Sequence, residues 1–324
     1  MQKKFFALSL GVILVLSLVI AGCGGGNPGG TPPPFSIAES LVTATTTSPL
    51  TFPYGDDSST FTVNYSYCIA KYEVTYQLWK EVYDWAQPHG YTFTTGSGKP
   101  GGGYDITNST EVFFNTGHDS DPVTCVNWYD AVVWCNALTE YYNAKKGTIL
   151  DCVYKDAASN VIKNSTDSII KTYLNSLAGG GFKPSAKGFR LPTSKEWELA
   201  ARYKDGTTWT HFNYASGATG AYTDSTATQA VAWYQNDNSK VSSNPDIYST
   251  HPVGKKNHNA LGLYDMSGNV SELCFEIITG MGNMTSVHGG SFYHTDSLMG
   301  VGTSLTSPPE VGGMNIGFRP VRTQ

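Results

Sequence analysis

Alternating apolar and polar residues predict the first strand of the folded chain. Within residues 61–73, apolar side chains recur at every second position, at Phe61, Val63, Tyr65, Tyr67 and Ile69. A period of two is typical of a half-buried strand, because successive side chains point to opposite faces. The next apolar residues, in the range 76–86, recur at helical spacing after Thr75. Because Thr is a favoured N-cap, we expect a helix to begin directly after it.

Two further helices are predicted farther along the chain. One follows residue 130, with apolar side chains on one face at Ala131, Trp134, Cys135 and Leu138. The other begins after Thr193, because Thr193 and Glu196 have the spacing of a capping box. Residues 197–201 then carry an apolar stripe. We interpret these residues as structural and assign them no chemistry.

The stretches between these helices contain few regular patterns. Residues 91–121 are rich in Gly, Thr and Ser, and residues 204–249 are polar apart from a short apolar run at 230–234. Both stretches predict loops. Residues 148–181 are interpreted as an insertion, in which two apolar pairs flank a polar turn at 156–160 and predict a hairpin.

The N-terminus has the composition of an export signal. Lys3 and Lys4 precede an apolar run at residues 5–22, which ends in Ala-Gly before Cys23. A basic start, an apolar run and small residues before a cleavage point are typical of a secretory signal peptide. The end of the run is similar to a bacterial lipobox, so we expect removal of residues 1–22 and lipidation of Cys23. The alternative is a single membrane-spanning helix, for which the run is of borderline length.

A tether and one large domain follow the signal peptide. Residues 23–34 comprise the lipidated cysteine and the sequence GGGNPGGTPPP, whose Gly- and Pro-rich composition is typical of a linker. Residues 35–324 fit one domain, because 40% of the chain is apolar and 13% is aromatic. We therefore expect a membrane partner through the lipid anchor, and a periplasmic or surface-exposed location in the bacterial cell envelope.

Charge and cysteine content exclude several classes of function. Without Lys3 and Lys4, 19 basic residues stand against 26 acidic ones, which gives a net charge of −7. Nucleic acids and anionic membrane surfaces attract basic proteins, so we expect no nucleic-acid partner. Five cysteines remain beside Cys23, so at least one is unpaired, and no C-x-x-C pair occurs for zinc or redox chemistry.

Three blocks near the C-terminus resemble one known protein family. They are GLYDMSGNVSE at residues 262–272, HGGSF at 288–292 and GFR at 317–319. Two earlier blocks, KYEVT at 71–75 and GFRLPTSKEWELAAR at 188–202, occur in the same order. All five are similar to the formylglycine-generating enzyme family, also called the sulfatase-modifying-factor family. The resemblance implies an α+β, C-type-lectin-like fold with little regular secondary structure.

This chain departs from the copper site that the resemblance implies. In catalytic members of the family, two cysteines after Gly-Gly-Ser bind copper(I) and activate oxygen. The corresponding positions are His294 and Met299. Thiolates are the soft ligands that copper(I) prefers, so we expect neither copper binding nor cysteine oxidation here. Ser271 and Leu273 replace two family tryptophans, and His288 replaces a basic residue.

Calcium is a second metal that the resemblance implies, near the G-N-V-x-E block. Asn269 and Glu272 match the family's pattern of oxygen ligands, and Asp265 is a nearby third candidate. Because hard oxygen atoms suit Ca²⁺, one interpretation of these residues is a calcium site. The alternative is a turn held by hydrogen bonds without a metal.

The segment between HGGSF and GFR has the composition of a recognition loop. Residues 291–316 are rich in Gly, Ser and Thr, contain no Lys or Arg, and carry only Asp296 and Glu310 as charges. Loops on a rigid scaffold commonly carry function. We predict that this segment forms a ligand-binding face through Tyr293, His294, Asp296, Ser297, Met299, Thr303, Ser304 and Thr306. The layout resembles the variable proteins of diversity-generating retroelements, in which mutated template adenines vary such a segment.

These observations favour a lipid-anchored, non-catalytic binding protein whose ligand, a protein or a small molecule, contacts the C-terminal face. An alternative is an oxidoreductase of the same family with altered metal ligands. A third hypothesis is a structural lipoprotein of the envelope. Copper binding by the purified protein would distinguish the second hypothesis from the first.

Overall fold

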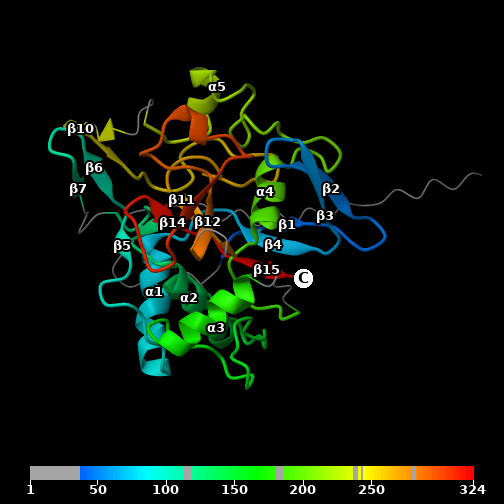
Figure 1. Ribbon diagram of the computed structural model, residues 1–324, viewed down its shortest axis with the longest axis vertical. Helices are drawn as coiled ribbons and strands as arrows, with labels where there is room; N and C mark the ends of the chain where they lie inside the picture. Colours follow the sequence, from blue (N-terminus) through cyan, green and yellow to red (C-terminus); the bar gives the residue numbers. More distant parts are fainter. Residues whose placement is uncertain (1–36, 113–117, 180–184, 236–239, 242–243, 279–281) are drawn as a thin grey trace, which may run out of the picture. The chain divides into compact units, whose positions relative to one another are not determined.

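The four-stranded sheet at the centre of the fold is made from the C-terminal blocks (Figure 1). Strand β11 (Ser271–Ile278) pairs antiparallel with β12 (Met284–His288) and parallel with β14 (Ile316–Gly317). Strand β13 (Ser304–Ser307) pairs with the other side of β12. The order is therefore β13-β12-β11-β14, with β13 and β14 at opposite edges.

The computed structural model describes one folded unit that begins at residue 37. It covers residues 37–112, 118–179, 185–235, 240–241, 244–278 and 282–324. The predicted signal peptide, Cys23 and the tether lie outside the described residues. Helices make up 24% of the chain and strands 25%, which confirms the predicted α+β class with little regular structure. Within the described ranges, no helix is long and apolar enough to cross a membrane.

A three-stranded sheet joins the two ends of this unit. Its central strand β4 (Tyr67–Ala70) pairs with β1 (Glu39–Val42) on one side and with β15 (Val321–Thr323) on the other. The GFR block at 317–319 runs from β14, in the sheet β13-β12-β11-β14, to β15 in this sheet. It therefore connects the two sheets.

The single strand predicted at 61–73 is two strands in the structure. Strand β3 (Ser59–Val63) pairs with β2 (Leu50–Tyr54) in a separate hairpin, and β4 begins after a short break. Val63 in the first strand and Tyr67 and Ile69 in the second are all buried. Strand β4 is buried at all four positions, so the half-buried character predicted for 61–73 holds for β3 but not for β4.

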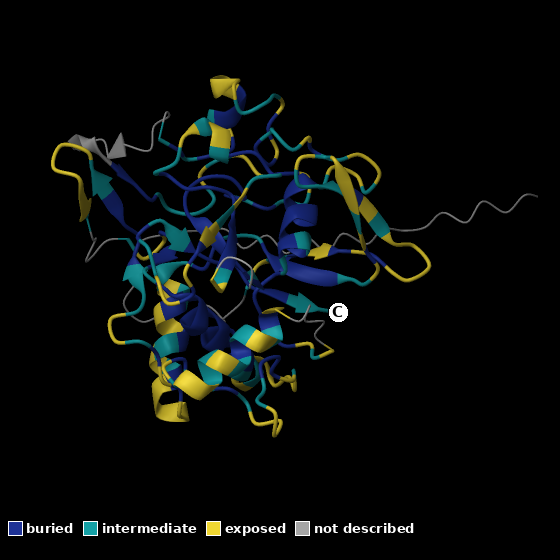
Figure 2. Cartoon of the chain, viewed as in Figure 1, coloured by how far each residue is buried: buried dark blue, intermediate teal, exposed yellow. Residues whose placement is uncertain are grey.

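Helices α1 (Tyr76–Ala86) and α2 (Trp128–Lys146) form where they were predicted. Thr75 Oγ1 accepts the backbone N–H of Leu78 at 3.2 Å, which confirms the predicted cap. Helix α2 is buried on nearly every side in its first turns, rather than along one stripe (Figure 2). The buried residues include the four that were predicted to face the core, Ala131, Trp134, Cys135 and Leu138.

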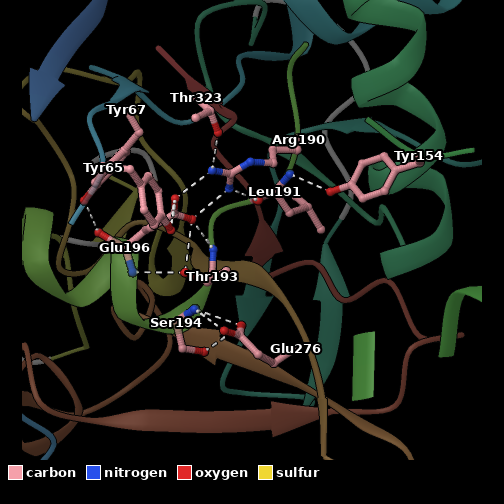
Figure 3. Close-up of polar contacts among 10 residues, drawn as sticks. All are labelled: Tyr65, Tyr67, Tyr154, Arg190, Leu191, Thr193, Ser194, Glu196, Glu276 and Thr323. Carbon is pink, nitrogen blue, oxygen red and sulfur yellow. Dashed lines mark hydrogen bonds and ion pairs between the residues drawn. The ribbon is translucent and has the colours of Figure 1, made fainter. Parts of the chain in front are cut away.

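Helix α4 (Ser194–Arg202) begins at the predicted capping box (Figure 3). Thr193 Oγ1 accepts the Glu196 N–H at 3.2 Å, and Glu196 Oε2 accepts the Thr193 N–H at 2.9 Å. The buried Arg190 guanidinium donates to the Glu196 carboxylate at 2.6 and 2.7 Å, and to Thr323 at 3.1 Å. These contacts tie the start of α4 to strand β15 and support a structural role for this block.

The remaining elements are mostly short and include several in stretches predicted as loops. They are η1 (Gln87–His89), β5 (Lys99–Pro100), β6 (Gly103–Asp105), β7 (Thr110–Val112), β8 (Val123–Thr124), α3 (Ser168–Gly179), α5 (Ser225–Gln229), β9 (Lys240–Val241), β10 (Asn244–Ser249) and η3 (Asp296–Leu298). Strands β6 and β10 pair, which joins the two stretches that were predicted to be loops. The predicted turn at 156–160 is confirmed, because the Asp156 N–H bonds the Asn160 carbonyl at 2.9 Å.

Candidate functional site

The Gly268-Asn269 turn leads into β11 and is fixed by buried side chains. Asn269 has a positive φ of 56°, a conformation that Asn adopts more readily than most residues. Its side-chain oxygen accepts the His251 N–H at 2.9 Å, and its amide donates to Glu73 at 2.6 Å. Glu73 also accepts the Val270 N–H at 3.1 Å. These hydrogen bonds, each between two groups of the protein, fix the conformation of the turn.

Glu272 forms a buried ion pair with Arg319 of the GFR block. The Nε and Nη2 atoms of Arg319 each lie 2.6 Å from one oxygen of this carboxylate. Trp197 Nε1 donates to the same carboxylate at 2.8 Å. The guanidinium also donates to three backbone carbonyls, those of Ala70, Lys71 and Tyr264. One bidentate pair therefore connects β11, α4 and the chain near β4.

The predicted calcium ligands do not fit a metal site in this arrangement. Both oxygens of Glu272 accept hydrogen bonds from Arg319, whose positive charge opposes a nearby cation. Asp265 accepts the Gly254 N–H at 2.7 Å, and burial raises its pKa to about 6. Among the residues that the structure describes, no group of three or more His, Cys, Asp or Glu is placed to hold a metal ion. The contacts of Asn269 and Glu272 support the hydrogen-bonded turn instead.

Met299 occupies the second copper-cysteine position and belongs to the core. Its side chain is fully buried in a cluster with Ala215, Ala232 and Tyr234. Gly290, with a φ of 68°, leaves room for it, because a Cβ at that position would clash with the Met299 methyl group. Packing against distant segments encloses the thioether of Met299, so this side chain does not lie on an exposed face of the fold.

His294 occupies the first copper-cysteine position and is half-buried. Its Nδ1 lies 3.0 Å from the Oγ of Ser291, and its backbone carbonyl accepts the Gln235 N–H at 2.9 Å. Burial lowers the pKa of His294, so the imidazole is neutral at pH 7. A neutral imidazole beside an enclosed thioether does not provide the two thiolates that catalytic members use.

Tyr293 packs against Tyr104, a residue that no sequence pattern singled out. Their ring centroids lie 4.7 Å apart, with the ring planes at 60°. Tyr104 lies on β6, where it pairs in register with Tyr248 of β10. Both rings pack on a buried cluster formed by Tyr248, Phe292 and Met314. The pairing of β6 with β10 is therefore what brings Tyr104 to the predicted ligand face.

The other predicted ligand residues come from two further elements. Asp296 is half-exposed and Ser297 is exposed, both on η3, which follows Tyr293 and His294 in the loop. Three more residues lie on or beside β13, namely Thr303, Ser304 and Thr306. Tyr293 instead packs on Met314, in the loop before β14. Neighbouring strands lie about 4.8 Å apart, so three spacings separate β13 from β14 by roughly 14 Å.

Three further positions that differ from the family's active site, Ser271, Leu273 and His288, are buried. Ser271 and Leu273 lie inside the fold on β11. His288 stacks on Trp197 with a centroid distance of 4.9 Å, and its Nε2 lies 3.2 Å from Ser286 Oγ. Burial lowers the pKa of His288 to about 4, so it is a neutral core residue at pH 7. The positive charge of the family's basic residue is therefore absent from this position.

Comparison with known proteins relates this geometry to one family. The family model described as a sulfatase-modifying factor enzyme 1-like domain matches residues 43–324. Chaperone protein LppX of Paenibacillus barcinonensis is 32% identical over 232 residues, which cover 69% of this chain. The match spans 65% of the length of that relative.

Solved structures share the fold over most of this chain. CarF has a TM-score of 0.67 at 28% identity, and the match covers 89% of this chain and 99% of CarF. Treponema denticola variable protein 1 has a TM-score of 0.56 at 25% identity, covering 88% of this chain and 95% of that protein. PvdO from Pseudomonas aeruginosa shares the fold with a TM-score of 0.53 at 17% identity, covering 88% and 94%. The chain belongs to the family of sulfatase-modifying factor enzyme 1-like domains, as its sequence blocks predicted.

Proposed function

We propose that this protein binds a polypeptide partner without catalysis, and that a lipid on Cys23 holds it at the cell envelope. The observation that carries the proposal is the buried side chain of Met299. Its side chain is packed in the core at the position of the family's second copper-binding cysteine, while the chain keeps the family's fold. Earlier in the same loop, the half-exposed Tyr293 and His294 provide aromatic and polar groups, and His294 stands at the family's first copper-cysteine position.

The relatives support a polypeptide as the ligand. One relative is named a chaperone protein, and one structural neighbour is named a variable protein. A chaperone acts on other polypeptides, and sequence variation on a shared fold suits the recognition of different partners. The chain's net negative charge argues against nucleic acid in the same role.

The alternative is an oxidoreductase that uses His294 and Met299 as altered metal ligands. The thioether of Met299 is enclosed by apolar side chains, and Nδ1 of His294 faces the hydroxyl of Ser291. Both groups therefore already have protein neighbours in place of a shared metal. Oxidation of a sulfatase-type cysteine peptide by the copper-loaded protein would support this alternative and contradict the non-catalytic proposal.

An aggregation assay tests the proposed function. The purified protein should reduce light scattering when a chemically denatured reporter enzyme is diluted out of guanidinium. The variant His89→Phe, which changes an exposed position after α1, should reduce scattering as much as the wild-type protein does. No reduction of scattering by the wild-type protein would refute polypeptide binding.

A further inference from the structure

The hydroxyl of Ser291 fixes which ring nitrogen of His294 carries the hydrogen. Its Oγ accepts the backbone N–H of Tyr293 at 3.3 Å and a side-chain N–H of Asn315 at 3.5 Å. These two donors occupy both lone pairs of the hydroxyl oxygen. The hydroxyl hydrogen is therefore donated to Nδ1 of His294, which lies 3.0 Å away. Because Nδ1 is the acceptor, Nε2 carries the ring hydrogen.

The Nε2–H group of His294 is a donor that the fold leaves available. Among the described residues, no protein acceptor is paired with Nε2. The backbone of His294 is held by the Gln235 N–H, so the position of the ring is fixed from two sides. Burial lowers the pKa of this imidazole, which keeps the donor uncharged at neutral pH.

The rings of His294 and Tyr293 have centroids 6.2 Å apart, and Tyr293 in turn packs against Tyr104. Tyr293 precedes His294 in the loop, and Tyr104 comes from β6 on a different part of the chain. Both rings are half-exposed and are supported from below by buried Phe292 and Met314. Tyr side chains offer a large, rigid and amphipathic contact area at a low cost in conformational entropy.

The charges around this group indicate an uncharged ligand atom. Residues 291–316 contain no Lys or Arg, and Asp296 lies two residues beyond His294. This segment therefore supplies no cation of its own to an anionic ligand. A carbonyl oxygen accepts a hydrogen bond from a neutral N–H without requiring a counter-charge.

We infer that Tyr104, Tyr293 and His294 form the ligand site, and that Nε2–H of His294 donates to a backbone carbonyl of an extended polypeptide. This inference rests on the proposed function, which requires a polypeptide partner but does not locate it. The site excludes Met299 and the three residues on or beside β13. It adds Tyr104 to the residues predicted from sequence, and Asn315 acts only by holding Ser291.

Binding of a permanently unfolded protein tests the inference. The probe is fluorescently labelled lactalbumin, reduced and carbamidomethylated, followed by anisotropy in buffer of physiological ionic strength, where long-range attraction is screened. His294→Gln places an amide N–H near the position of Nε2, so it should bind within about threefold of wild type. His294→Phe and His294→Asn lack that donor and should bind about tenfold more weakly. Circular dichroism melting curves confirm that each variant is folded.

The ring nitrogens of His294 give a readout that needs no ligand. In the wild-type protein, ¹⁵N chemical shifts should identify Nε2 as protonated and Nδ1 as unprotonated. Ser291→Ala removes the hydroxyl and should produce a mixture of tautomers. A wild-type ring protonated at Nδ1 would overturn the donor assignment.

The outcomes separate this inference from the proposed function. Wild-type binding that is unchanged in Tyr104→Ala and Tyr293→Ala would overturn the location of the site while the proposed function stands. Binding by His294→Phe equal to wild type would overturn the role of the imidazole. Displacement of the probe by a chitin oligosaccharide would overturn the assignment to a polypeptide. No wild-type binding at all would refute the proposed function together with the inference.

Discussion

Replacing Arg319 by lysine tests how strongly the ion pair with Glu272 stabilises the fold. Arg319 is fully buried, and its guanidinium makes two hydrogen bonds to Glu272 and three to backbone carbonyls. A lysine ammonium has three N–H donors, whereas a guanidinium has five in a planar fork. In Arg319→Lys, at least two of the present acceptors therefore lose their donor.

The expected loss follows from the number of acceptors left without a donor. A buried acceptor that loses its partner costs about 1–3 kcal/mol. Two such acceptors predict a loss of about 2–6 kcal/mol in the free energy of unfolding. The carbonyls of Ala70, Lys71 and Tyr264 lie in or next to β4 and the GLYDM block, so the loss weakens the connection between the chain ends.

Guanidinium unfolding followed by tryptophan fluorescence measures this loss in the full-length protein. Arg322→Lys is the matched control, because Arg322 pairs with Glu39 and its side chain remains 21% exposed. The control should lose less than about 1 kcal/mol, as expected for a partly solvated ion pair. A loss below about 1 kcal/mol in Arg319→Lys, or equal losses in both variants, would refute the reasoning.

Cys23→Ser should release the protein from the membrane fraction, because the proposed lipid anchor requires that thiol; full retention would favour a membrane-spanning helix. Calcium and a chelator should leave the melting temperature unchanged, because Glu272 is paired with Arg319; a rise with calcium would restore the metal interpretation. Because buried His288 resists protonation, the free energy of unfolding should fall as the pH is lowered from about 6.5 to 4. The pKa of His288 is about 4 in the folded state and about 6.5 in the unfolded state, so only the unfolded state binds the proton in this range. This difference lowers the free energy of unfolding by about 3 kcal/mol. Buried Asp265, with a raised pKa, acts in the opposite direction, so comparison with His288→Phe isolates the histidine; identical pH profiles would contradict its role.

Local signals in the sequence predicted the starts of helices because a cap involves residues only three positions apart. Thr75 bonds the Leu78 N–H, and Thr193 and Glu196 form the capping box. Strand limits depend on partners elsewhere in the chain, which a periodic pattern does not identify. The pattern at 61–73 therefore spans two strands, one in a hairpin and one between the two ends of the domain.

Only part of the candidate site was predicted, because one of its residues comes from a distant segment that a local pattern does not identify. Tyr293 and His294 lie in a loop whose composition is visible in the sequence, and both are half-exposed. Tyr104 joins them only through the pairing of β6 with β10. Glu272 matched a calcium pattern because a carboxylate suits either a cation or an arginine, and its partner Arg319 lies 47 residues farther along the chain.

Burial separates the positions of residues 291–316 that can vary from those that the fold requires. Changes of the adenines in asparagine codons reach nine residues of this segment, namely Tyr293, His294, Thr295, Asp296, Ser297, Gly300, Val301, Gly302 and Thr303. Residues 293–297, 302 and 303 are half-exposed or exposed. Methionine codons are not reached in this way, and Met299 and Met314 are buried in two separate clusters. Gly300 and Val301, which are reachable but buried, depart from this division. A template repeat that varies this gene should therefore differ from it within codons 293–297 and match it at both methionine codons.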